Sequence, residues 1–151
     1  MINKMGDSSY HKLKNIKGIF DNIPIIEKAL ENRLNQLPDI LREKKKITNW
    51  IVQIKKMNDN INNIKKSKIV ELERNINYNF AEPDLVVLSF IQPSIINIFR
   101  ELYTDSSKLS LNVDFEPYMI MDEMTNALAL FGDAAINLAL LMTIRDCRKS
   151  T

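Results

Sequence analysis

Cysteine, histidine and glycine are scarce in this sequence, which has one cysteine, one histidine and three glycines among its 151 residues. The single Cys147 excludes an internal disulfide, and one cysteine with one histidine is too few for a zinc site of the usual kind. His11 is interpreted as a residue of a polar tail, not as a ligand. The low glycine content, with many Ile, Leu, Asn and Lys residues, predicts an all-α fold.

Long apolar runs also look scarce. We expect no apolar stretch of the roughly eighteen residues needed to cross a bilayer, and the segment from Asn3 to Lys17 has no signal-peptide pattern. We therefore expect a cytoplasmic protein with no membrane partner. The length suits one ordinary domain with a buried core, or a small domain with an appendage.

Charge is distributed unevenly along the chain. Residues 40–75 carry ten basic and four acidic side chains, whereas residues 76–151 carry five basic and ten acidic ones. Because the residue pattern changes at the same place, we expect a boundary near Asn79 to Pro83. The predicted division is a flexible N-terminus over residues 1–20, a helical appendage over residues 21–78 and a second helical domain over residues 83–151.

The appendage reads as two helices. The first is expected to begin near Asp21 or Asn22 as cap, with Pro24 in its first turn, and the second to span residues 39–76. Their apolar stripes consist of Ile26, Leu30, Leu34 and Leu37 in the first and of Ile40, Ile47, Ile51, Ile54, Ile61, Ile64 and Leu72 in the second. Polar residues interrupt a strict heptad in the second, which favours an antiparallel helical hairpin or an intermolecular, coiled-coil-like helix pair over a long regular coiled coil.

Three lysines of the second helix form a candidate RNA-binding stripe. Lys45, Lys56 and Lys66 are separated by eleven and ten residues, close to three helical turns each, so we expect their side chains to rise along one face. Such a stripe can follow the phosphates of duplex RNA without reading bases. The alternative is an ordinary solvated face opposite the isoleucines. Trp50 lies beside the apolar stripe, so it does not indicate stacking on single strands.

The second domain is expected to begin with a short helix over residues 85–90 and a turn at Gln92-Pro93-Ser94. A further helix over residues 95–103 would follow, with Ser94 as its cap, and residues 104–117 would form a polar connection. Ser94 is not interpreted as a nucleophile, because no histidine or lysine base lies in the local pattern.

The last predicted helix, from about Asp122 to Arg145, contains two residues that its composition does not favour. Gly132 costs a helix about 1 kcal/mol relative to alanine, and Asp133 would cost more if it were buried without a partner. One interpretation is that another group approaches Gly132 closely while Asp133 meets a cation. The other is close packing of a helix on the small residues, with Asp133 paired to an arginine or capping a neighbouring helix.

The run Leu128-Ala-Leu-Phe-Gly-Asp-Ala134 resembles the signature helix of the ribonuclease III family. The segment Leu88-Ser-Phe-Ile-Gln-Pro-Ser-Ile95 resembles the family's upstream turn, with Gln92 at the place of a histidine. Ala129 occupies the position of a glutamate ligand in the larger enzymes and resembles the compact mini-ribonuclease III branch. The similarity covers residues 83–146.

The resemblance implies a Mg²⁺-dependent (or Mn²⁺-dependent) endoribonuclease for double-stranded or structured RNA. The enzyme would be a homodimer without a small-molecule cofactor, with Asp133 as its catalytic metal ligand. Asn126 and Asn137 share a helical face with Asp133 and would hold metal-bound waters. The family's second acidic motif is not found after Asp133, so we expect the copy of the domain to be incomplete at its C-terminal side. The alternative is a non-catalytic helical module for RNA binding or oligomerisation.

Overall fold

The computed structural model describes residues 16–38 and 41–149, and its regular structure there is entirely helical, which confirms the all-α prediction. The elements are α2 (Ile23–Gln36), α3 (Leu41–Asn63), a π-helical segment (Ile64–Lys68), α4 (Ile69–Ile76), α5 (Pro83–Ser89), a 3₁₀ turn (Pro93–Ile95), α6 (Ile96–Thr104), α7 (Ser106–Leu109), α8 (Glu116–Met119) and α9 (Met121–Lys149).

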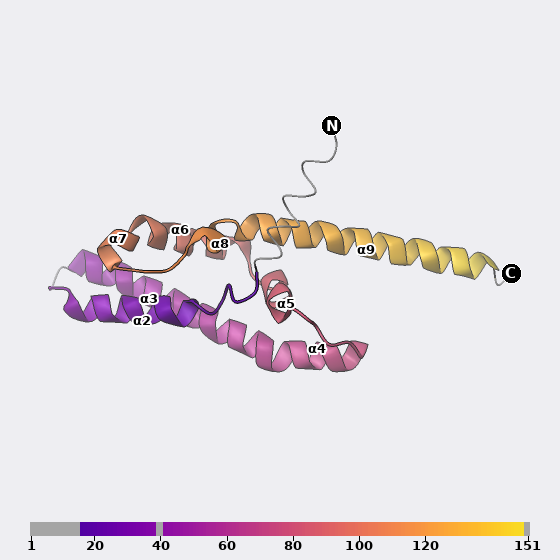
Figure 1. Ribbon diagram of the computed structural model, residues 1–151, viewed down its shortest axis with the longest axis horizontal. Coiled ribbons are helices and arrows are strands. Elements are labelled where there is room, and N and C mark those ends of the chain that lie inside the picture. The colour runs from indigo at the N-terminus through magenta and orange to yellow at the C-terminus, as the bar shows by residue number, and fades with distance from the viewer. Residues whose placement is uncertain (1–15, 39–40, 150–151) are drawn as a thin grey trace, which may run out of the picture.

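Helices α2 and α3 run antiparallel, and α6, α7 and α8 lie along the same pair (Figure 1). Pro24 lies in the first turn of α2, where its missing N–H is no loss. Asn22 occupies the N-cap position but makes no side-chain capping bond. The isoleucines predicted to form the α3 stripe, Ile47, Ile51, Ile54 and Ile61, are all buried. Amphipathic spacing therefore explains how this pair packs.

The predicted long second helix contains a π-helical segment, Ile64–Lys68, between α3 and α4. A π turn adds one residue to the helical repeat, so side chains beyond it are rotated relative to a regular α-helix. Lys65 in this segment forms an ion pair at 2.6 Å with the buried carboxylate of Asp84 at the start of α5. The segment thus joins the basic helix to the second half of the chain.

One hydrophobic cluster contains buried residues from Ile16 to Met124, on both sides of the expected boundary near Asn79 to Pro83. That stretch belongs to the connection between α4 and α5. The connection begins at Asn77, which has a left-handed φ of 52°.

Two further expectations, for Ser94 and for residues 104–117, are corrected. Ser94 is not the cap of α6, because Ile95 occupies the N-cap position without a side-chain bond. The polar connection over residues 104–117 contains α7 and the start of α8.

The flexible N-terminus was expected over residues 1–20, of which residues 1–15, including His11, lie outside the described residues. For the remainder the expectation is wrong, because Ile16, Ile19 and Phe20 are buried in the core. Gly18 has a φ of +77°, a conformation that side-chain-bearing residues rarely adopt. Its N–H donates to Oδ2 of Asp84 at 2.8 Å, which fixes this entry segment to α5.

Tyr118 of α8 joins the N-terminal entry segment to α6 within the core. It is fully buried, its ring stacks on Phe99 with centroids 4.2 Å apart, and its hydroxyl donates to the carbonyl oxygen of Ile19 at 2.6 Å. Burial, together with the negative charges of Asp21 and Asp114, raises the pKa of Tyr118 above its usual value of 10.0. The phenol therefore stays protonated and keeps its hydrogen bond when tyrosines in an unfolded chain begin to ionise.

We expect Tyr118 to make folding sensitive to alkali. Since its pKa is raised in the folded state, its contribution is complete below pH 10 and is lost as the pH rises further. Tyr118→Phe should cost about 1 kcal/mol at pH 8 through the lost hydrogen bond and should reduce the additional loss above pH 10. Urea unfolding at pH 8 and above pH 10 measures the free energy of unfolding of each protein. Tyr103→Phe, at an exposed tyrosine, is the matched control; equal pH profiles for wild type and Tyr118→Phe would contradict the assignment.

Candidate functional site

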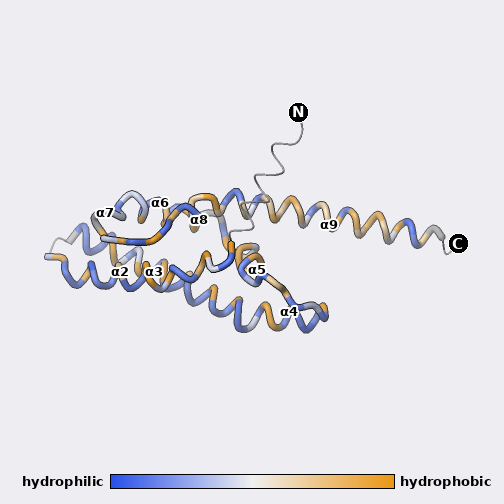
Figure 2. Tube along the Cα trace, in the orientation of Figure 1, coloured by the Kyte–Doolittle hydropathy of each residue, from blue (hydrophilic) through white to orange (hydrophobic). Residues whose placement is uncertain are grey.

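Helix α9 begins inside the bundle and then leaves it (Figure 1). Met121 and Met124 are buried and Leu128 packs partly against the core, but every residue from Ala129 to Cys147 is exposed. Figure 2 shows that this projecting part is mostly apolar. The exposed large apolar residues of α9 are Leu130, Phe131, Ile136, Leu138, Leu140, Leu141, Met142 and Ile144.

This apolar surface extends around the whole helix, which is typical of a helix in the core of a larger assembly or in a membrane. Burying a leucine or isoleucine side chain contributes roughly 1.5–3 kcal/mol, so covering the eight exposed apolar residues of α9 would contribute on the order of 10–20 kcal/mol. Contiguous apolar patches of this kind mark interaction surfaces. The helix is therefore the main candidate surface for association.

The expectation that no apolar run approaches membrane-spanning length is wrong. The 27 residues Met121–Cys147 are long and apolar enough to cross a membrane by length and composition, although core helices of soluble proteins meet the same criteria. Asp133 lies next to the midpoint of this run, where a carboxylate costs about 2.5–3.5 kcal/mol on insertion. That cost favours burial against protein, where Asp133 can meet a cation or a hydrogen-bond donor.

The predicted catalytic face is open to solvent. Gly132 has no atom within 4 Å of the position where a Cβ would lie, so the close approach expected there is not made by the described part of the chain. Asp133, Asn126 and Asn137 are all exposed on α9. Among residues 16–38 and 41–149, no group of three His, Cys, Asp or Glu side chains could hold a metal ion. The structure brings one carboxylate and two amides to this face.

The predicted basic stripe is altered by the π-helical segment. Lys45, Lys56 and Lys66 are all exposed. Because Lys66 lies inside the π-helical segment, it is displaced from the position that regular helical spacing gives it. Lys68 lies about eleven regular steps beyond Lys56 and shares its face. Lys68, and not Lys66, lines the same groove as Lys56.

That groove, of about 570 Å³, lies between α3 and the segment from Phe90 to Ile95. Its walls are Gln53, Lys56, Met57, Asn60, Ile61, Asn63, Ile64, Lys68, Phe90, Ile91, Gln92 and Ile95. Nothing in the residue pattern indicates that Phe90 lies beside the lysines. Gln92 was noted only as the residue in the place of a histidine, and the Pro93 turn is the one local feature that could have drawn attention to this segment.

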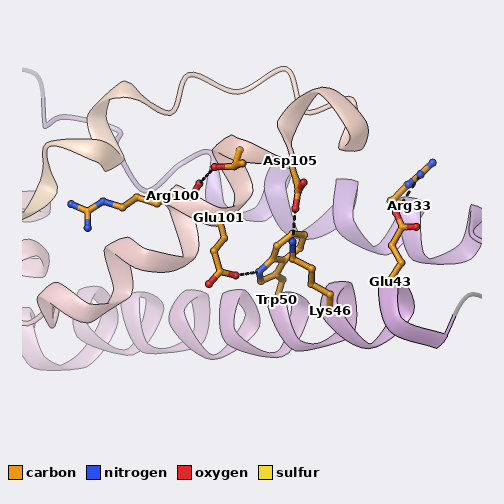
Figure 3. A network of polar contacts seen from close by, with 8 residues as sticks. Arg33, Glu43, Lys46, Trp50, Arg100, Glu101 and Asp105 are labelled. Carbon is orange, nitrogen blue, oxygen red and sulfur yellow. Dashed lines mark hydrogen bonds and ion pairs between the residues drawn. The ribbon is translucent and has the colours of Figure 1, made fainter.

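Polar contacts join α3 to α6 and to Asp105, the residue that follows α6 (Figure 3). Trp50 is buried and its indole N–H donates to Oε2 of Glu101 at 2.8 Å. Lys46 forms an ion pair with Asp105 at 2.6 Å and lies 4.7 Å from the centre of the Trp50 ring. These contacts fix α6, whose N-terminal end follows the groove segment directly. The burial of Trp50 agrees with its predicted place beside the apolar stripe.

Lys55 is tied to the neighbouring helix, unlike Lys56. Its ammonium lies 2.7 Å from Oε1 of Glu31 in α2, and the hydrogen bond and negative charge of Glu31 raise the pKa of Lys55. Within the described part of the chain, Lys56 and Lys68 make no ion pair. Both lysines are therefore open to an external anion.

No protein-family model, no curated protein and no solved structure matches this chain. The resemblance to ribonuclease III accordingly rests on the motif residues quoted above, and the activity that it implies is treated below as a proposal.

Proposed function

We propose that this chain is part of a ribonuclease III-like endoribonuclease that hydrolyses phosphodiester bonds in double-stranded or structured RNA with Mg²⁺ or Mn²⁺. The observation that carries the proposal is Asp133 itself. It is a carboxylate in the middle of an apolar helix, next to a glycine whose open side nothing in the described chain covers. A structural carboxylate would be expected at a cap or in an ion pair, and Asp133 lies far from either end of α9.

The residues of this face fit a metal only in part. Mg²⁺ prefers oxygen ligands and keeps several waters, which suits Asp133 with the amides of Asn126 and Asn137. The described residues do not supply the further carboxylates of a catalytic centre. The proposal therefore requires additional acidic groups on helices that cover α9. Such helices would bury the exposed apolar surface of α9 and would also bring the missing carboxylates to Asp133.

The test is cleavage of a labelled duplex RNA with Mg²⁺. If this chain reaches the proposed assembly in solution, it should cleave the duplex, and Asp133→Asn should reduce the rate to that of RNA alone because the amide replaces the anionic ligand. Asp146→Asn is the matched control, since Asp146 is an exposed carboxylate on the same helix and lies beside Arg145. Equal cleavage by wild type and Asp133→Asn would overturn the role of Asp133.

The second candidate is a non-catalytic helical module for RNA binding or oligomerisation. It is favoured by the absence of a metal-binding group among the described residues and by the open lysines of α3. This function predicts salt-sensitive RNA binding that Asp133→Asn leaves unchanged, without cleavage. A purely structural helical protein would show neither cleavage nor salt-sensitive RNA binding.

A further inference from the structure

We propose that the groove between α3 and the segment from Phe90 to Ile95 binds an unpaired nucleotide of a structured RNA. This inference rests on the proposed RNA-directed function and identifies the feature of the RNA that this chain would recognise. It concerns a surface separate from Asp133, formed where the π-helical segment turns Lys68 toward Lys56.

The accessible surface of the groove is mixed, with somewhat more apolar than polar area. Met57, Ile61, Ile64 and Ile91 form its buried floor. The open apolar groups are the ring of Phe90 and the half-buried Ile95, and the open polar groups are two lysine ammonium groups and several side-chain amides. An amphipathic peptide helix, which needs an open apolar groove, is the alternative occupant that the experiment tests.

The charge of the groove suits phosphate. Lys56 and Lys68 both line it, and no aspartate or glutamate does. The two lysines lie about 17 Å apart along the helix axis, estimated as eleven regular steps of 1.5 Å. They can therefore contact phosphates that flank a short run of nucleotides along the groove, with the unpaired nucleotide between them. These contacts would be electrostatic and would weaken with added salt.

Phe90 provides the feature that distinguishes an unpaired base from a duplex. Its side chain is 55% exposed although it is a large apolar residue, and it lines the groove opposite α3. Bases in loops and bulges can leave the helical stack and pack on aromatic rings, whereas paired bases cannot. The amides of Asn60 and Gln92 line the same groove and can donate to and accept from a base edge.

The experiment compares two RNA hairpins that differ by one bulged uridine, with binding measured by fluorescence anisotropy in EDTA. The bulged hairpin should bind roughly tenfold more tightly, as expected for one stacked base. Phe90→Ala should remove this preference, and Phe90→Trp should retain it. Circular dichroism checks that each variant is folded, which is expected because Phe90 is exposed.

The lysines provide a second readout. Lys56→Gln and Lys68→Gln should weaken binding of both hairpins and make the salt dependence shallower, whereas Lys66→Gln, at an exposed lysine that does not line the groove, should change neither. Equal binding of the two hairpins by wild type would overturn the proposal. A second result would also overturn it. An amphipathic peptide of leucine and glutamate would displace the RNA from wild type, and Phe90→Ala would abolish binding of the peptide while RNA binding persists. Because no divalent metal is present, a failure of Asp133-dependent cleavage leaves this result unaffected.

Discussion

Replacing both Leu138 and Leu141 with glutamine should abolish self-association of the chain while leaving its thermal unfolding temperature unchanged. The two side chains are 60% and 65% exposed on α9, so they add nothing to the core of a single chain. Glutamine is about as good a helix former as leucine, and α9 should stay helical. We expect a second copy to cover this surface in wild type, since the apolar side chains of α9 are open along most of its length. Light scattering after size exclusion measures the mass, and circular dichroism measures the unfolding temperature.

Leu102→Gln is the matched control, because Leu102 is fully buried in α6. Placing an unpaired amide there should cost about 3 kcal/mol or more, since packing is lost and a polar group is buried. A drop of similar size for the α9 variant would show that α9 is covered within a single chain. Flotation of wild type with lipid vesicles, lost in the α9 variant, would instead assign the covering surface to a membrane and would contradict self-association.

The sequence was sufficient to place α9, because alanine and leucine dominate it and its composition favours a helix in any surroundings. Its exposure was not foreseen. No apolar run of membrane-spanning length was expected, whereas Met121–Cys147 qualifies by length and composition even with Asp133 near its middle. The surface that covers α9 belongs to a partner, and the residues of α9 do not specify that partner. The surroundings of Gly132 and Asp133 therefore cannot be predicted from the sequence of α9.

The π-helical segment could not be predicted from the sequence, for a different reason. Nothing in Ile64-Lys-Lys-Ser-Lys68 breaks a helix, since it contains neither proline nor glycine. The turn is instead associated with long-range contacts, in which Lys65 meets Asp84 and lies 5.8 Å from the centre of the Phe20 ring. One inserted residue is enough to replace Lys66 by Lys68 on the predicted basic stripe. Regular spacing thus located two of the three lysines that share this face, and tertiary contacts determined the third.

Asp84→Ala should lower the free energy of unfolding by about 3 kcal/mol, at the low end for a broken buried ion pair because Lys65 is one-third exposed. Asp84 is the one buried charged side chain of the described residues. Its Oδ2 accepts from the N–H of Gly18, and its Oδ1 lies at ion-pair distance from Lys65, though without hydrogen-bond geometry. The loss corresponds to a fall of roughly 6–12 °C in the unfolding temperature, measured by calorimetry.

Two lysine variants separate the ion pair from general charge effects. Lys65→Met should destabilise the chain because it leaves Asp84 buried with only the Gly18 bond, whereas Lys66→Met, at the exposed neighbour, should have little effect. The double variant Lys65→Met/Asp84→Leu should recover part of the loss, because no unpaired buried charge remains. Recovery should stay incomplete, since Gly18 keeps a backbone N–H without its acceptor. If Lys65→Met and Lys66→Met proved equally mild, the role of the ion pair would be contradicted, and the hydrogen bond from Gly18 to Asp84 would remain as the contact that holds the entry segment to α5.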